Sequence, residues 1–117
     1  MKVLIADDMV FNRLLLKEML ISLGCQCFDF PNGAKLIDYY KLNGADVVFL
    51  DIEMPVMNGL ETAVCFKAEL KSTVPIISFT AHNTDDYNEK MKKVGFDEIM
   101  YKPFTLNELK NIIEKYI

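Results

Sequence analysis

Histidine and cysteine are scarce in this sequence, and tryptophan is absent. His82 is the single histidine among 117 residues, and the three cysteines are Cys25, Cys27 and Cys65. Cys25 and Cys27 would share one face of an extended segment, but without further cysteines or nearby histidines they cannot complete a tetrahedral zinc site. We therefore expect buried free thiols, which fit a reducing compartment.

Long apolar runs and an excess of basic charge are also lacking. No run approaches the roughly 20 residues of a membrane-spanning helix, and the N-terminus lacks the charged and then apolar layout of a signal peptide. Acidic residues outnumber basic ones by 17 to 13, and the net charge of −4 repels nucleic acid. We expect a cytoplasmic protein that binds neither membranes nor nucleic acid directly.

Length and apolar content set the domain organisation. With 117 residues, of which 51% are hydrophobic, the chain has the size of one compact domain, which we assign to residues 1–117. Short apolar runs predict strands at residues 2–6, 26–30, 46–50, 75–79 and 98–101, and helical periodicity predicts helices at residues 12–23, 33–42, 60–70, 85–94 and from 106 onward. This alternation favours a doubly wound α/β fold with a five-stranded parallel sheet and helices on both faces.

Polar residues follow the ends of four predicted strands. They are Asp7 and Asp8 after the first strand, Asp51 after the third, Thr80 after the fourth, and Lys102 with Pro103 after the fifth. Ligands of open parallel sheets bind outside the carboxyl ends of the strands, so we expect these side chains to face one crevice. Three carboxylates at one edge repel each other unless a cation compensates.

The turn after the first strand helps to identify the ligand. It has no glycine-rich loop of the kind that binds a nucleotide or flavin phosphate, and its two aspartates would repel such a phosphate. A hard divalent cation suits the carboxylates better, and Mg²⁺ prefers oxygen ligands of this type. We therefore expect Mg²⁺ as the cofactor.

Four motifs occur in a fixed order at these strand ends. They are Asp7-Asp8, Asp51-Ile-Glu-Met-Pro running into Asn58-Gly59, Thr80-Ala81, and Lys102-Pro103-Phe104. As an ordered set they are highly specific, and over its full length the sequence resembles a response regulator receiver domain of the CheY-like superfamily. The resemblance implies a flavodoxin-like sheet with strand order 2-1-3-4-5, and a role in a two-component system or phosphorelay.

The resemblance implies that Asp51 attacks a phosphohistidine on a histidine kinase or histidine phosphotransfer protein. The product would be an acyl phosphate that hydrolyses slowly. Lys102 would pair with phosphoryl oxygens, and the Thr80 hydroxyl would donate a hydrogen bond to one of them. Because an ordinary aspartate is ionised at neutral pH, we expect Asp51 to need no general base.

The resemblance also implies a set of metal ligands. Asp8 and Asp51 would bind Mg²⁺ directly, Asp7 would bind mainly through water, and the backbone carbonyl of Glu53 would add a further ligand. Glu53 and His82 lie at positions where family members vary, and this variation resembles a tuning of the lifetime of the phosphoryl group.

The switch positions depart from the family's pattern. Receiver domains generally carry an aromatic residue three positions before the active-site lysine, where its ring moves with the threonine, and here that position is Ile99. Tyr101 lies two residues further along the same strand and therefore on the same face, which makes it our candidate substitute. We expect phosphorylation to shift Thr80 and then the face formed by the fourth helix, fifth strand and fifth helix, which leaves room for a phosphorylation-dependent dimer.

The first predicted helix carries more apolar residues than one core-facing stripe explains. We expect the following residues to face the sheet: Asn12, Leu15, Leu16, Met19 and Leu23. The 100° step per residue then places Val10, Phe11 and Leu14 toward solvent beside Asp8. Clustered apolar residues at the rim of a site are typical of a partner surface, so we assign these three and Pro103 to docking of the phosphohistidine partner.

Two other functions stay open as alternatives. An aspartate-nucleophile phosphatase with a Rossmann-like fold would turn over its phosphoaspartate, but such enzymes place the nucleophile after the first strand, with a second aspartate two residues on. Here the nucleophile candidate follows the third strand and Glu53 takes the second position. A receiver-fold binding module without phosphorylation is disfavoured because every catalytic position is filled. We therefore expect a signalling phosphoacceptor, with autophosphorylation and autodephosphorylation as its only intrinsic activities.

Overall fold

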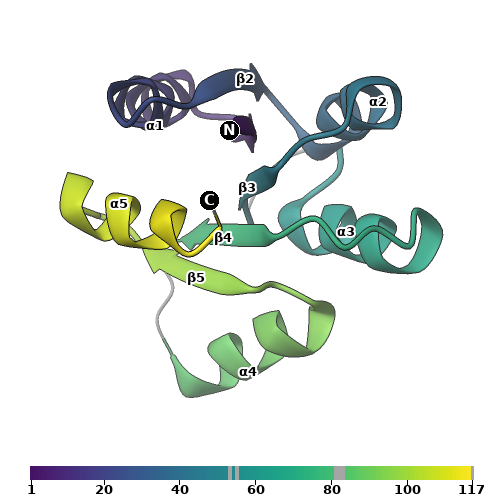
Figure 1. Ribbon diagram of the computed structural model, residues 1–117. Coiled ribbons are helices and arrows are strands. Elements are labelled where there is room, and N and C mark those ends of the chain that lie inside the picture. The colour runs from purple at the N-terminus through teal and green to yellow at the C-terminus, as the bar shows by residue number, and fades with distance from the viewer. Residues whose placement is uncertain (53, 55, 81–83, 117) are drawn as a thin grey trace.

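Strands and helices alternate along the chain in the computed structural model, which describes residues 1–52, 54, 56–80 and 84–116 (Figure 1). The elements are β1 (Lys2–Ala6), α1 (Val10–Ser22), β2 (Gln26–Phe30), α2 (Gly33–Asn43), β3 (Val47–Asp51), α3 (Gly59–Val64), the π-helix η1 (Cys65–Glu69), β4 (Ile76–Thr80), α4 (Asp85–Val94), β5 (Glu98–Tyr101) and α5 (Leu106–Glu114). The predicted alternation is therefore confirmed.

The five strands form one parallel sheet in the order β2-β1-β3-β4-β5. This order confirms the predicted doubly wound fold, because the chain runs outward from β1 in both directions. The strand order reverses between β1 and β3, which is where such sheets bind ligands. Ala6 pairs with Leu50 in the β1–β3 register, so Asp7 and Asp51 follow neighbouring positions at the carboxyl edge.

Two apolar layers cover the sheet, because alternate strand residues point to opposite faces. Val3, Phe49 and Ile77 pack in one core with Leu16 of α1 and Leu109 of α5. On the other face lies a second core, which α2, α3, η1 and α4 cover; its buried members include Leu4, Val48, Ile76, Leu36, Ala63, Phe66 and Met91. Figure 1 shows α1 and α5 on one side of the sheet and α2 and α3 on the other. Helices on both faces were predicted.

The start of α3 is fixed against the end of β3. Asn58 and Glu61 form a reciprocal capping box that satisfies the first amides of α3. A Cβ atom at Gly59 would lie 2.5 Å from the carbonyl oxygen of Asp51, so only glycine allows this close approach. The N-terminus of α3 therefore lies against the strand end that presents the Asp51 carboxylate.

Several element boundaries differ from the prediction by one or two residues, and the third helix differs by more. The third helix was expected to run unbroken through residues 60–70, but α3 ends at Val64, and the η1 turn follows, in which the Leu70 amide donates to the Cys65 carbonyl, 2.9 Å away. This wider turn belongs to a segment with both Cys65 and Phe66 buried. β3 and β4 extend one residue further than expected, so Asp51 and Thr80 are the last residues of their strands.

Candidate active site

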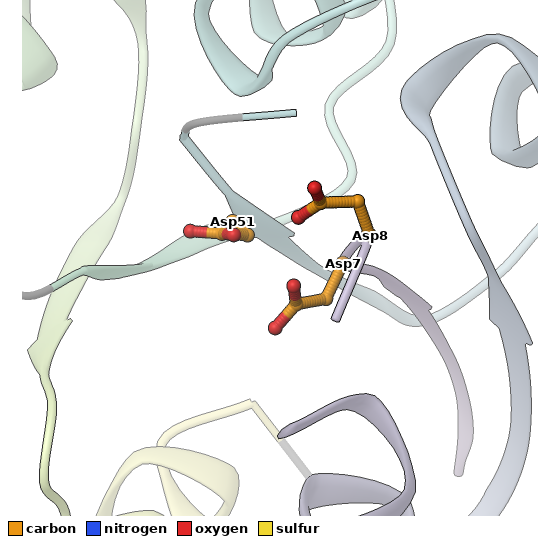
Figure 2. A group of neighbouring side chains, drawn as sticks. All are labelled: Asp7, Asp8 and Asp51. Atoms are coloured by element: carbon orange, nitrogen blue, oxygen red, sulfur yellow. The ribbon is translucent and has the colours of Figure 1, made fainter. Parts of the chain in front are cut away.

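Three aspartates meet at the carboxyl edge of the sheet, as the sequence predicts. Oxygens of Asp7, Asp8 and Asp51 all lie within 4.8 Å of one another. Figure 2 shows Asp7 and Asp8 on the segment after β1, with Asp51 on the neighbouring strand β3. Asp7 is fully buried, Asp51 is 8% exposed and Asp8 is exposed, so the cluster opens to solvent on the side of Asp8.

The carboxylate of Asp7 has a fixed orientation. Its Oδ1 accepts a hydrogen bond from the backbone amide of Met9 at 2.9 Å. Its Oδ2 is buried and accepts no hydrogen bond from the part of the chain that the structure describes. A buried carboxylate oxygen without a donor is costly unless a cation is nearby.

Lys102 brings positive charge to the two buried carboxylates. Its Nζ lies 3.6 Å from Oδ1 of Asp51 and 3.7 Å from Oδ2 of Asp7. The same Nζ lies 4.8 Å from the centroid of the Phe79 ring, a cation–π distance. The backbone of Lys102 is tied to β4, because its amide donates to the carbonyl of Thr80 at 2.7 Å.

The carboxyl of Asp51 titrates in an unusual range. Burial and the neighbouring Asp7 carboxylate raise its pKa to about 7, although Lys102 acts in the opposite direction. Without a bound cation, Asp51 therefore keeps its proton to a higher pH than an ordinary aspartate does. The raised pKa agrees with the expected repulsion among uncompensated carboxylates, whereas the expectation of an ionised Asp51 concerns the site with its cation bound.

The donor set of the cluster fits Mg²⁺. Asp7, Asp8 and Asp51 offer only carboxylate oxygens, which are the ligands of a hard divalent cation. The buried Oδ2 of Asp7 has no hydrogen-bond donor among the described residues, so a bound cation or one of its waters would satisfy it. The predicted backbone ligand, Glu53, lies outside the described residues, as does His82.

The three switch candidates lie at neighbouring positions of β4 and β5. Thr80 is buried at the end of β4, and the register pairs it with Tyr101. Ile99 is partly buried and packs against the core that α2, α3, η1 and α4 cover. Ile99 and Tyr101 also line a cavity of about 240 Å³ together with Asn88 and Lys92 of α4. Both candidates therefore contact the space between β5 and α4.

The candidate docking residues are exposed beside the acidic cluster. Val10 is 56% exposed, Phe11 is 75% exposed and Leu14 is 46% exposed. Pro103 is exposed as well. The prediction that Leu15 faces the sheet is wrong, because Leu15 is 47% exposed and Leu16 and Leu20 supply the buried stripe of α1.

Sequence reasoning missed two further features near the site. Leu15 and Phe104, with Asn12, Phe79, Lys102 and Pro103, line a cavity of about 300 Å³ between α1 and the segment after β5. Arg13 donates from Nη1 to the Asp7 carbonyl at 3.0 Å. The cavity needed the tertiary placement of α1 against β5, whereas the position of Arg13 one turn after the two aspartates was visible in the sequence.

Two further predictions concern the cysteines and membrane-spanning helices. Cys25, Cys27 and Cys65 are free thiols; Cys25 and Cys65 are buried and Cys27 is partly buried. None of the helices in the described residues combines the length and the apolar character that crossing a membrane requires.

The fold and the acidic cluster define a doubly wound α/β domain with a candidate cation site at its topological switch point. A model of the response regulator receiver domain family matches residues 3–114. The chain therefore belongs to the response regulator receiver domain family, whose members act as signalling phosphoacceptors in two-component systems.

Relatives of known name agree with this assignment. The sensor histidine kinase RcsC of Salmonella typhi is 32% identical over 116 residues, which cover 99% of this chain and 12% of RcsC. The sporulation initiation phosphotransferase F of Bacillus subtilis (strain 168) is 31% identical over 116 residues, which cover 99% of this chain and 93% of that protein. The chain thus spans a small part of the first relative and nearly all of the second.

A solved structure supports the fold. The receiver domain of the sensor histidine kinase PA1611 from Pseudomonas aeruginosa PAO1 was crystallised with a magnesium ion coordinated in its active site cleft. It superposes on 98% of this chain and 95% of its own with a TM-score of 0.87, at 24% sequence identity. At that identity the comparison shows a shared fold.

Proposed function

We propose that Asp51 of this domain accepts a phosphoryl group from a phosphohistidine, with Mg²⁺ as cofactor. The observation that carries the proposal is the cluster of Asp7, Asp8 and Asp51 oxygens within 4.8 Å, with Lys102 Nζ 3.6 Å from Asp51. The donor would be a histidine kinase or a histidine phosphotransfer protein. One relative is named a sensor histidine kinase and another a phosphotransferase, which supports a donor of this kind.

In the proposed reaction, a carboxylate oxygen of Asp51 attacks the phosphorus atom. The bond between phosphorus and the imidazole nitrogen breaks, and the nitrogen keeps the electron pair. Bound Mg²⁺ supplies charge neutralisation for the phosphoryl oxygens. Lys102 would add a second positive charge, and the hydroxyl of Thr80 would donate a hydrogen bond to a phosphoryl oxygen. Hydrolysis of the resulting acyl phosphate would be slow and would return Asp51 to its free state.

We assign the direct metal ligands to Asp8 and Asp51, with Asp7 acting mainly through water and the Glu53 carbonyl as a further ligand. The exposure of Asp8 supports a cation that retains some of its water, as Mg²⁺ usually does. Ionisation of Asp51 accompanies cation binding, because a positive charge lowers the pKa of a neighbouring carboxyl. The raised pKa therefore does not prevent Asp51 from acting as the nucleophile.

The signal would leave the site through Thr80. The pairing of Thr80 with Tyr101, and the cavity that Ile99 and Tyr101 share with α4, support a shift of the α4–β5–α5 face. A dimer that forms on phosphorylation would use this face. The donor would dock on Val10, Phe11, Leu14 and Pro103, an assignment that the exposure of these side chains supports.

Intact-mass spectrometry tests the proposal. With a small phosphodonor such as acetyl phosphate and Mg²⁺, we expect one added phosphoryl group that is lost slowly on standing. Asp51→Asn should abolish the addition, and chelation of Mg²⁺ should suppress it. Asp38→Asn, which alters an exposed carboxylate on α2, should behave as the unaltered protein. Equal modification of Asp51→Asn, or no effect of chelation, would contradict the proposal.

A further inference from the structure

Asp7 is held in place by three hydrogen bonds from three parts of the fold. Its amide donates to the carbonyl of Phe30 in β2 at 3.2 Å, and its Oδ1 accepts the amide of Met9 at 2.9 Å. The third bond is the donation from Arg13 Nη1 to the backbone carbonyl of Asp7 at 3.0 Å. Only the last of these depends on a side chain outside the turn.

Arg13 is itself fixed by the neighbouring strand. Its Nε donates to Oδ2 of Asp29 at 2.8 Å, and the two side chains are only 15% and 16% exposed. Although burial raises the pKa of Asp29, the hydrogen bonds from Lys17 and Arg13 prevail and lower it, so the ion pair is intact at neutral pH. One guanidinium thus connects β2 to the backbone of the acidic turn through a geometry that an arginine fork allows.

The turn between β1 and α1 has little other support. Met9 occupies the N-cap position of α1, and its side chain caps no backbone amide of the first turn; its Sδ accepts instead from the side-chain Nδ2 of Asn12 at 3.5 Å. The usual capping residues, serine, threonine, aspartate and asparagine, are therefore replaced by a residue that cannot cap. The orientation of Asp7 then depends on the hydrogen bonds at its backbone amide, its backbone carbonyl and its Oδ1. These bonds leave Oδ2 directed toward Lys102.

We propose that Arg13 is a positioning residue for the cation site, because it holds the Asp7 carbonyl and so fixes where the Asp7 and Asp8 carboxylates lie. This inference rests on the proposed Mg²⁺ site. Residues that orient metal ligands contribute substantially to metal affinity, even though they do not touch the metal. Arg13 would act in this way without contacting the cation or the phosphoryl group.

The direction in which Mg²⁺ affinity changes when Arg13 is replaced distinguishes a positioning role from an effect of its charge. Arg13 is a cation near a cation site, so loss of its charge alone should strengthen Mg²⁺ binding. Loss of positioning should weaken it. Lys17 provides a matched control, because its Nζ lies 2.8 Å from the other oxygen of Asp29, and its described contacts do not include Asp7.

The test compares Arg13→Gln with Lys17→Gln. Isothermal titration calorimetry with MgCl₂ at pH 8 should show roughly tenfold weaker binding for Arg13→Gln. Lys17→Gln should bind as tightly as the unaltered protein, or more tightly. A second readout needs no metal: in EDTA, hydrogen exchange of the Met9 amide should be faster in Arg13→Gln and unchanged in Lys17→Gln, because that amide reports on the Asp7 carboxylate.

Several outcomes would overturn the inference. Unchanged Mg²⁺ affinity and unchanged Met9 exchange in Arg13→Gln would do so, as would equal changes in both variants. If the unaltered protein bound no Mg²⁺, the proposed cofactor would be wrong, and the Met9 exchange would still decide whether Arg13 holds the turn. If Arg13→Gln does not fold, Arg13→Lys replaces it. Lysine keeps the charge beside Asp29 but has a single nitrogen, so the same loss is expected.

Discussion

The Nζ atom of Lys102 lies 3.6 Å from Oδ1 of Asp51, which is ion-pair distance but longer than a hydrogen bond. Oδ2 of Asp7 lies 3.7 Å from the same Nζ atom, and the centroid of the Phe79 ring lies 4.8 Å from it. The ammonium group thus lies between two carboxylates and an aromatic ring without a short bond to either carboxylate. We infer that a phosphoryl oxygen on Asp51 would lie within reach of the Lys102 ammonium group.

Lys102→Gln should therefore slow phosphorylation without weakening Mg²⁺ binding. The change removes a positive charge that would neutralise the transferring group, and we expect a loss of roughly 10- to 100-fold in the rate with a small phosphodonor. Mg²⁺ affinity should stay equal or increase, because a repelling charge is removed. Stopped-flow or mass-based rates, combined with calorimetric titration, measure the two effects. A parallel loss of both would indicate that Lys102 is structural.

The raised pKa of Asp51 makes Mg²⁺ binding depend on pH. A cation prefers the ionised carboxyl, so the affinity should rise by up to about tenfold per pH unit below pH 7 and level off above it. Binding at pH 6 should release a proton, which calorimetry in buffers of different ionisation enthalpy detects. Affinity that is flat between pH 5.5 and pH 8 would contradict the role given to Asp51.

The same pKa predicts a change in stability. Without Mg²⁺, the folded protein has Asp51 titrating near 7, against an ordinary value of 3.8, so this group favours folding at low pH, and its contribution is lost as the pH rises to about 7. Asp51→Asn should raise the free energy of unfolding at pH 8 in EDTA by about 1–3 kcal/mol. Urea denaturation at pH 4 and pH 8 measures the difference, which should be small at pH 4, close to the ordinary pKa of 3.8.

The exposed apolar residues of α1 predict a defect specific to the protein donor. Leu14→Asp should slow phosphotransfer from a phosphohistidine protein by about tenfold, because a charge is placed in the docking surface. Phosphorylation by a small donor should be nearly unchanged. Ile21 on the same helix is a matched control, since it is 47% exposed against 46% for Leu14 and lies two turns farther from Asp8. Equal losses in both assays for Leu14→Asp, or an equal effect of Ile21→Asp, would refute the docking surface.

The switch prediction concerns Thr80. Beryllofluoride with Mg²⁺ should shift backbone NMR signals across α4 and β5, and Thr80→Ala should reduce these shifts while Mg²⁺ still binds. The reason is that Thr80 pairs with Tyr101, which shares a cavity with residues of α4. Shifts confined to the acidic cluster in the unaltered protein would argue against output through this face.

Much of this site could be predicted because strand ends are marked in the sequence. Apolar runs that stop at Asp7, Asp51 and Thr80 indicate both the strands and the edge at which their polar residues gather. The convergence of the aspartates with Lys102 follows from parallel topology alone. That prediction required no knowledge of side-chain packing.

Other features depend on tertiary packing that periodicity does not encode. Leu15 lies next to the buried position Leu16, so a small rotation of α1 decides which leucine the core receives. The π-turn after Val64 depends on one hydrogen bond between residues five apart. The pKa of Asp51 depends on burial and on Asp7, neither of which the residue type reveals. At Leu15 and at the π-turn the sequence prediction was wrong.

The position of the phosphoryl group is the most direct test of the central claim. The protein is phosphorylated with acetyl phosphate and Mg²⁺ and then reduced with borohydride, which converts an aspartyl phosphate to homoserine. Tandem mass spectrometry of the peptides should find homoserine at position 51 and aspartate at positions 7 and 8. Homoserine at either of those positions, or no reduction product anywhere, would contradict the assignment of Asp51 as the phosphoacceptor.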